Sequence, residues 1–235
     1  VRIQWASSAA SNVRTNTSSK ADNDNDVTSI VPSYSKILVF VMTTILIWVS
    51  EPILSLVDTT VVGQRANNAV IQLAALGPAT MLIDNCSYLT YFLSMATTSL
   101  IAQARAKGDI RKLQVTSSQV LGLAAFLGAI ITTVVFSAGR PLLRWTAGLS
   151  VTPELLRLSL DYSRIRSMVS PLAIMGLVAQ SICLACLDTT TPFLAVLAAS
   201  LVNVFGDLYL VGQRNMGIQG AAYATAAASV TSTAV

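Results

Sequence analysis

The feature that most constrains this chain is an apolar run from Ile37 to Val62 that is long enough to cross a lipid bilayer. A helix needs about 20 consecutive apolar residues to span the hydrocarbon core. Inside this run stands an acid, Asp58. An acid at the middle of a spanning helix costs about 2.5–3.5 kcal/mol on insertion scales. A chain that keeps such a residue either hides it in an internal cavity or uses it.

Further apolar runs follow the first. They cover residues Leu73–Ile101, Val120–Ser137, Leu158–Leu184 and Pro192–Val211, and a sixth starts near Ile218 and reaches the last residue, Val235. None alternates with a period of two, as barrel strands would, so each run predicts a helix. Only 11% of the residues are charged, against about 25% in soluble domains. We therefore expect an all-α membrane protein with six transmembrane helices, whose first partner is the lipid bilayer.

Residues 1–35 differ from the rest of the chain. They are rich in Ser, Thr and Asn and cannot bury a core, which predicts a disordered polar tail. The Arg- and Ser-rich, acid-poor first twenty residues are typical of an organelle transit segment, and a cytosolic tail is an equal alternative. The chain begins at Val1 rather than Met, so we expect its true start to be missing. The membrane domain is expected over residues 36–235.

The charges and special residues exclude several classes of protein. The net charge is only +4 and the Lys and Arg residues are dispersed, so no nucleic-acid partner is expected. The chain has no histidine, and its "CLAC" segment lies in an apolar run without a second cysteine pair, which argues against a metal centre. Motifs of membrane-embedded enzymes are missing, so we expect neither an enzyme nor an organic cofactor. The densest basic segment, "QARAKGDIRK" at residues 103–112, predicts a cytoplasmic loop.

Polar residues recur inside the runs at helical spacing, so they line up on helix faces. The first run carries Thr44, Glu51, Ser55 and Asp58, the second Asp84, Tyr88, Tyr91, Met95 and Thr98, the fifth Asn203 and Asp207, and the sixth Gly217, Ala221 and Thr225. Polar stripes on several helices cannot all face lipid and must meet around a shared interior. Packing hydrogen bonds could account for the Ser and Thr residues. They do not readily account for Asp58 and Asp207, because a buried acid stays neutral or needs a cation.

Four segments follow one another in a characteristic order along the chain: "EPILSLVDTTVVGQ", "LAALGPATMLIDNCSYLTYFLSMATTSLIAQ", "LDTTTPF" and "NVFGDLYLVGQRNMGIQGAAYATAAA". Together they resemble the multidrug and toxic compound extrusion (MATE) family, most closely its DinF-like branch with plastid members. A related flippase of lipid-linked saccharides, the alternative function, should lack "VDTTVVG" followed by "GAAYAT". The resemblance covers about Lys36 to Val235.

The resemblance implies more than the spacing does. MATE proteins have twelve helices in two lobes and export small organic compounds by alternating access, in exchange for H⁺ or Na⁺. This chain matches the N-lobe, with its sixth helix truncated and the C-terminal lobe of the same chain missing as a partner. The family's coupling site is matched by Asp58, Asn203, Asp207, Thr225 and Tyr162.

Glu51 falls where the family places another cavity-facing polar residue, and the stripe of the second run adds Asp84 and Tyr88 to the cavity lining. Two carboxylates close together in a low-dielectric cavity cannot both be ionised at small cost. A proton, or a Na⁺ held at this site, would neutralise the pair and change which helix packing is favoured. Pro52 and Gly206 offer places where the helices could bend. The likeness to plastid members leads us to expect a multi-pass protein of an organelle envelope.

Overall fold

The computed structural model of the protein describes residues 34–88, 90–148 and 151–235. Within these ranges all regular elements are helices, so the expected all-α class is confirmed. The predicted tail lies outside the described residues, apart from Tyr34 and Ser35, which already belong to the first helix. The elements are α2 (Tyr34–Arg65), α3 (Ala69–Tyr88), α4 (Tyr91–Ala106), α5 (Ile110–Ala147), α6 (Pro153–Met168), α7 (Ser170–Ala185), α8 (Thr190–Asp207), the π-helix η2 (Leu208–Gln213) and α9 (Gly217–Ala234).

Four helical stretches of the described residues are long and apolar enough to cross a membrane. They are α2, α3 with α4, α5, and α8 with η2, and the bent pair α6–α7 would be a fifth. Helix α9, the predicted sixth span, does not meet this measure, because Ser, Thr and Gln alternate with its alanines. Its position explains why α9 need not be as apolar as the other spans. It packs against five other α-helices, namely α2, α3, α6, α7 and α8, and against η2.

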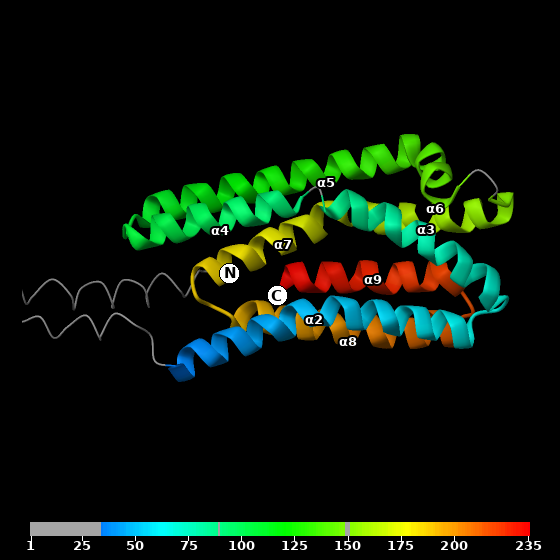
Figure 1. The fold of residues 1–235 in the computed structure, drawn as a ribbon, viewed down its shortest axis with the longest axis horizontal. Coiled ribbons are helices and arrows are strands. Elements are labelled where there is room, and N and C mark those ends of the chain that lie inside the picture. Colours follow the sequence, from blue (N-terminus) through cyan, green and yellow to red (C-terminus); the bar gives the residue numbers. More distant parts are fainter. Residues whose placement is uncertain (1–33, 89, 149–150) are drawn as a thin grey trace, which may run out of the picture.

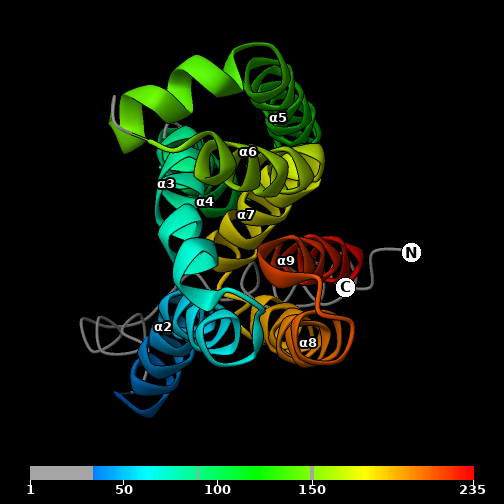
Figure 2. The same ribbon diagram turned by 90° about the vertical axis from the view of Figure 1, so that its right-hand side faces the viewer.

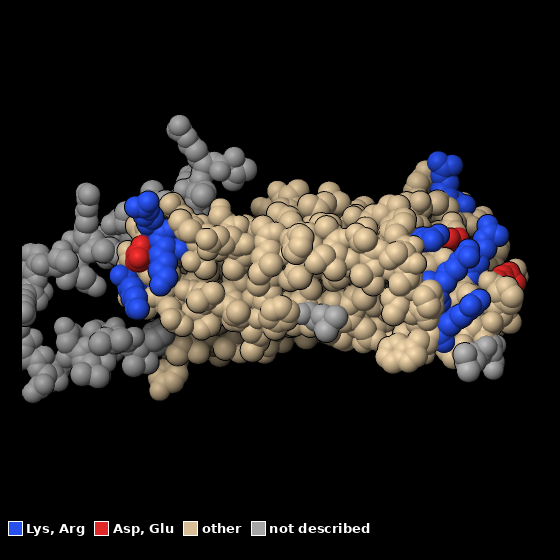
Figure 3. All heavy atoms as spheres, turned by 90° about the horizontal axis from the view of Figure 1, so that it is seen from above, with Lys and Arg blue, Asp and Glu red and all other residues tan. Residues whose placement is uncertain are grey.

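The helices form an elongated bundle whose members run roughly along its long axis (Figure 1). An end-on view places α9 between α8 on one side and α6 and α7 on the other (Figure 2). Lys and Arg gather at the two ends of the bundle, and the surface between them is uncharged on the face in Figure 3. This distribution is that of a protein whose middle lies in hydrocarbon and whose ends lie at the headgroups.

The fourth predicted span is broken, which corrects the expectation of a continuous helix there. It divides into α6 and α7, which are bent by 53° at Val169. The break has a clear cause in Pro171, which has no N–H to bond the carbonyl of Ser167. The hydroxyl of Thr132 in α5 donates to that carbonyl instead, at 2.5 Å. Pro52, by contrast, lies inside the uninterrupted helix α2.

Gly128 of α5 allows the start of α7, at Ser170 and Pro171, to pack closely against α5. A Cβ atom at Gly128 would lie 2.3 Å from the Cα of Pro171 and 2.8 Å from the carbonyl carbon of Ser170. Both are backbone atoms, which cannot rotate away as a side chain could. The bend between α6 and α7 therefore depends on a residue without a side chain in the neighbouring helix.

Gly128→Ala should lower the stability of the protein by about 1–3 kcal/mol, the usual cost of overpacking a tight contact. Gly122→Ala is the matched control, because Gly122 lies in the same helix and has nothing within 4 Å of the added methyl group. Alanine favours a helix over glycine by about 1 kcal/mol, so the control should be neutral or stabilising. The melting temperatures of the two purified variants in one detergent measure the difference, and equal values would contradict this account of the bend.

Candidate functional site

Four of the predicted coupling residues converge where α2, α8 and α9 meet. Asp58 comes from α2, Asn203 and Asp207 lie one turn apart on α8, and Thr225 comes from α9. Asp58 is 9% exposed, Asn203 2% and Asp207 0%, and Thr225 is half-buried. The i, i+4 spacing on α8 turns the two side chains to one face. The packing of three helices then encloses two acids in the apolar part of the lobe.

Hydrogen bonds connect three of these side chains. The amide Nδ2 of Asn203 donates to Oγ1 of Thr225 at 3.1 Å. The Thr225 hydroxyl lies 3.4 Å from Oδ2 of Asp58 and 2.9 Å from the carbonyl oxygen of Ala221. It has one proton, so it can donate to only one of them at a time. Thr225 therefore links α8 to α2 through an adjustable contact.

Most of the oxygen atoms at this junction have no hydrogen-bond partner among the described residues. They are Oδ1 of Asp58, Oδ1 of Asn203 and both carboxyl oxygens of Asp207, all buried. The Asp58 and Asp207 carboxyls come from α2 and α8, which pack against each other. Two buried carboxyls with so few donors are unfavourable as a pair of anions. A proton or a cation would remove this cost, and carboxylate, carbonyl and hydroxyl oxygens are the ligands that hard cations take.

The backbone around Asp207 is adapted in two ways. A Cβ atom at Gly206 would lie 2.8 Å from Cβ of Ala224, so Gly206 allows α8 and α9 to pack closely beside the acids. Directly after Asp207 the helix widens into the π-helix η2, where the N–H of Arg214 bonds the carbonyl of Tyr209. The apolar run Pro192–Val211 predicts one regular helix, and η2 departs from that prediction. Such π-helical turns occur frequently at functional sites.

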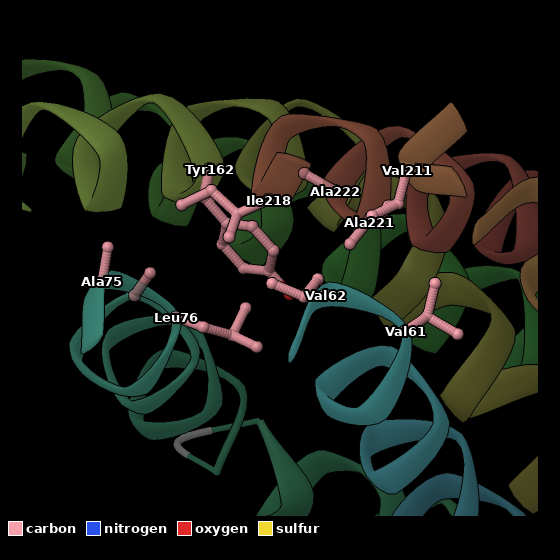
Figure 4. Close-up of a cluster of buried hydrophobic side chains, with 10 residues drawn as sticks. Val61, Val62, Ala75, Leu76, Tyr162, Val211, Ile218, Ala221 and Ala222 are labelled. Atoms are coloured by element: carbon pink, nitrogen blue, oxygen red, sulfur yellow. The ribbon is translucent and has the colours of Figure 1, made fainter. Parts of the chain in front are cut away.

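Tyr162, the fifth predicted coupling residue, lies beside the four rather than among their hydrogen bonds. It is 1% exposed and belongs to an apolar cluster with Val62, Leu76 and Ile218. Figure 4 shows its ring pointing from α6 into the space between α3, α2 and α9. The ring still lies within Coulombic range of Asp58. Tyr162 thus belongs to the apolar packing of α2, α3 and α9 next to the acids.

The predicted cavity-lining residues lie at a different depth. Glu51 precedes Asp58 by two turns of α2, about 10 Å along the helix axis. Glu51 is exposed, Asp84 is half-buried and Tyr88 is 63% exposed. Tyr91 stacks between Tyr88 and Trp48, with ring centroids 5.6 Å and 6.3 Å apart. Glu51, Asp84 and Tyr88 are thus accessible, and they are separate from the buried group around Asp58.

Arg166, a charged residue that the sequence patterns did not single out, lies near the level of Glu51 and Asp84 rather than at that of Asp58. Arg166 of α6 has its guanidinium carbon 5.9 Å from the centroid of the Tyr162 ring. It lies within Coulombic range of Asp84, Glu51 and Asp58. The signal in the sequence was the pair of arginines in "YSRIR" inside an apolar run. Spacing alone does not reveal that one of them lies over the ring of Tyr162, a predicted coupling residue.

Comparison with known proteins identifies the family. The MatE family model matches residues 43–208. Over 187 residues the chain is 37% identical to "Protein DETOXIFICATION 47, chloroplastic" of Arabidopsis thaliana, covering 79% of this chain and 33% of that protein. Over 178 residues it is 30% identical to "DNA damage-inducible protein F" of Escherichia coli (strain K12), covering 75% of this chain and 38% of that protein.

The fold is similar to that of a solved structure described as the outward-facing conformation of a multidrug resistance MATE family transporter of the MOP superfamily. The TM-score is 0.76 at 22% identity, covering 85% of this chain and 43% of that chain. The chain thus spans less than half the length of the proteins it matches, as an N-lobe would. These matches confirm the resemblance read from the motifs and favour it over the flippase alternative. The chain belongs to the MatE family, a family of multi-pass membrane transporters rather than enzymes.

Proposed function

We propose that this chain is the ion-coupling lobe of a secondary antiporter that exports small organic compounds in exchange for H⁺ or Na⁺. The observation that carries the proposal is the buried pair Asp58 and Asp207. Three of their four carboxyl oxygens have no donor among the described residues, and the fourth has only the Thr225 hydroxyl at 3.4 Å. A purely structural polar network would satisfy its members, because an unsatisfied buried group costs about 1–3 kcal/mol. A site that must accept and release a cation keeps those oxygens free.

The exchange follows from the residue types. A proton shared by Asp58 and Asp207, or a Na⁺ held by their oxygens with those of Asn203 and Thr225, neutralises the junction of α2, α8 and α9. When the ion leaves, repulsion between the two carboxylates disfavours the close packing of these helices. Occupancy of the site thereby biases one arrangement of the lobe over another, which is the requirement for coupling ion entry to substrate exit.

The geometry of α8 and α9 supports transmission of this change. The two helices touch at Gly206 and Ala224, one residue away from Asp207 and Thr225 respectively. A small increase in the distance between the two acids therefore also moves the tight contact between Gly206 and Ala224, where a side chain on Gly206 would not fit. The second lobe of the antiporter, against which this lobe would move, is the partner that we propose for the surface carrying Glu51. An exposed acid at the centre of a spanning helix does not face hydrocarbon.

The proposed function is tested with the full-length protein in proteoliposomes. Efflux of a panel of fluorescent organic dyes is followed under an imposed pH gradient and, separately, under an imposed Na⁺ gradient. We expect one of the two gradients to drive accumulation of at least one dye, and dissipation of that gradient to stop it. Accumulation that proceeds equally without either gradient would rule out secondary antiport.

We further propose that the protein resides in a plastid envelope. The support is the likeness to a chloroplastic relative and the Arg- and Ser-rich start of the chain. Residues 1–35 joined to a fluorescent reporter should direct it to plastids in plant cells. Replacing Arg2 and Arg14 by Glu should abolish that import, because transit segments are poor in acids. A reporter that stays in the cytosol with the original residues would contradict a targeting role for this segment.

A further inference from the structure

The register of α3 against α6 sets the depth of Arg166. The hydroxyl of Ser159 donates to the carbonyl of Ala75 at 2.8 Å, and that of Ser163 donates to the carbonyl of Ala79 at 3.4 Å. Both pairs are separated by 84 residues, so the two helices run parallel with a constant offset. The same offset brings Arg166 level with the last turns of α3, half a turn short of Asp84.

Glu51 reaches the same level from α2. Helices α2 and α3 are antiparallel neighbours joined by a short turn after Arg65. Glu51 and Asp84 lie at about the same distance from that turn, roughly 20 Å at 1.5 Å per residue. Two carboxylates and one guanidinium therefore occupy one level, about 10 Å beyond the Asp58 group. Arg166 lies within Coulombic range of both of these carboxylates.

This level is accessible, unlike the Asp58 group. Trp48 is 47% exposed and Tyr88 63% exposed, and both stack on Tyr91. Stacked aromatic rings beside carboxylates form a surface that attracts cations, through the ring faces as well as through the charges. A fixed guanidinium at the same level opposes that attraction and offers a partner to an anion.

We propose that Arg166 determines the charge preference of this aromatic surface toward organic ligands. Its positive charge offsets one of the two carboxylates, so the surface discriminates only weakly between organic cations and organic anions. Without it, Glu51, Asp84 and the aromatic rings would form a strongly cation-selective surface. The proposal rests on the proposed function only in taking the ligand to be a small organic compound.

The test compares two organic ions of nearly equal size and opposite charge, tetraphenylphosphonium and tetraphenylborate. Their binding to the full-length protein in detergent is measured by equilibrium dialysis, and the ratio of the two affinities is the readout. Arg166→Met should raise the preference for the cation by about tenfold or more, since it removes one charge at short range. Arg166→Lys keeps the charge and should retain the original ratio.

Arg164→Met is the matched control. Arg164 lies two residues away on the same helix, and its guanidinium carbon is 5.6 Å from the centroid of the Phe136 ring, on α5. A change in the ratio that is equal in both methionine variants would overturn the proposal, as would an unchanged ratio in folded Arg166→Met.

If Arg166→Met does not fold, Glu51→Gln tests the same charge balance, because it removes a negative charge instead of a positive one. It should shift the ratio toward the anion, and an unchanged ratio would overturn the proposal. All of these measurements are made without an ion gradient. Failure of ion-driven export, which would refute the proposed function, is therefore distinguishable from failure of charge selection by Arg166.

Discussion

Asp58→Asn is expected to reduce ion-driven export by at least about thirtyfold while leaving insertion and folding near normal. Two unit charges about 4 Å apart interact by about 4 kcal/mol at an effective dielectric of 20. Losing half of this at the site corresponds to about thirtyfold in ion affinity. Folding should tolerate the change, because Oδ1 of Asp58 has no hydrogen-bond partner among the described residues. An asparagine oxygen can still accept from Thr225.

Asp109→Asn provides a control with the same chemical change. The Asp109 side chain accepts from the N–H of Lys112 at 2.9 Å and caps α5 outside the apolar part of the bundle. Asparagine is about as good an N-cap as aspartate, so the control should transport like the unchanged protein. Initial rates in proteoliposomes, normalised to the amount of inserted protein, measure both variants. Export at the original rate and ion dependence in Asp58→Asn would remove Asp58 from the coupling mechanism.

Asp207→Asn should abolish the stabilisation of the protein by its coupling ion, and adding Asp58→Asn should have no further effect. A ligand that binds only the folded state at one hundred times its dissociation constant stabilises it by about 2.7 kcal/mol. If both acids form one site, removing either one removes this stabilisation. The melting temperature is followed in rising NaCl, with KCl at matched ionic strength as reference, and again over a series of pH values.

The pattern of the double variant separates one shared site from two independent groups. With one site, the ion-dependent rise in melting temperature disappears in each single variant and in the double variant. With independent groups, each single variant would retain part of the rise, and the losses would add. The second pattern would separate Asp207 from Asp58. The salt series also shows which ion binds, because Na⁺ should act at constant pH and protons only through pH.

The buried group around Asp58 could be predicted only in part from residue spacing. The four-residue spacing of Asn203 and Asp207 places them on one face of a helix whatever surrounds it. That Asp58 and Thr225 join them was implied by the resemblance to a family rather than by spacing. Separations along the chain of this size say nothing about which helices become neighbours. The structure brings these four side chains together, whereas Tyr162 lies in the adjoining apolar cluster.

The group formed by Glu51, Asp84 and Arg166 could not be predicted from sequence patterns alone. The stripe expected along Leu73–Ile101 assumed one continuous helix. Tyr91 stacks on Tyr88, as their spacing predicts, whereas Met95 and Thr98 are exposed and Thr97 is buried. Spacing shows which residues share a helix face. Which face is buried depends on the neighbouring helices, and the sequence pattern does not contain that information.

The sequence by itself determined that this chain is a bundle of membrane-spanning helices with acids in its interior. Apolar length and helical periodicity are local properties, and a bilayer imposes them on every span. Only the tertiary structure decided that α9 packs against α2, α3, α6, α7 and α8, that Gly128 admits the bend at Pro171, and that Arg166 lies level with Glu51 and Asp84. These depend on which helices touch and at what register. The free energy of a buried charge or a tight contact is set by neighbours that are distant in the chain, as Asp58 and Thr225 are.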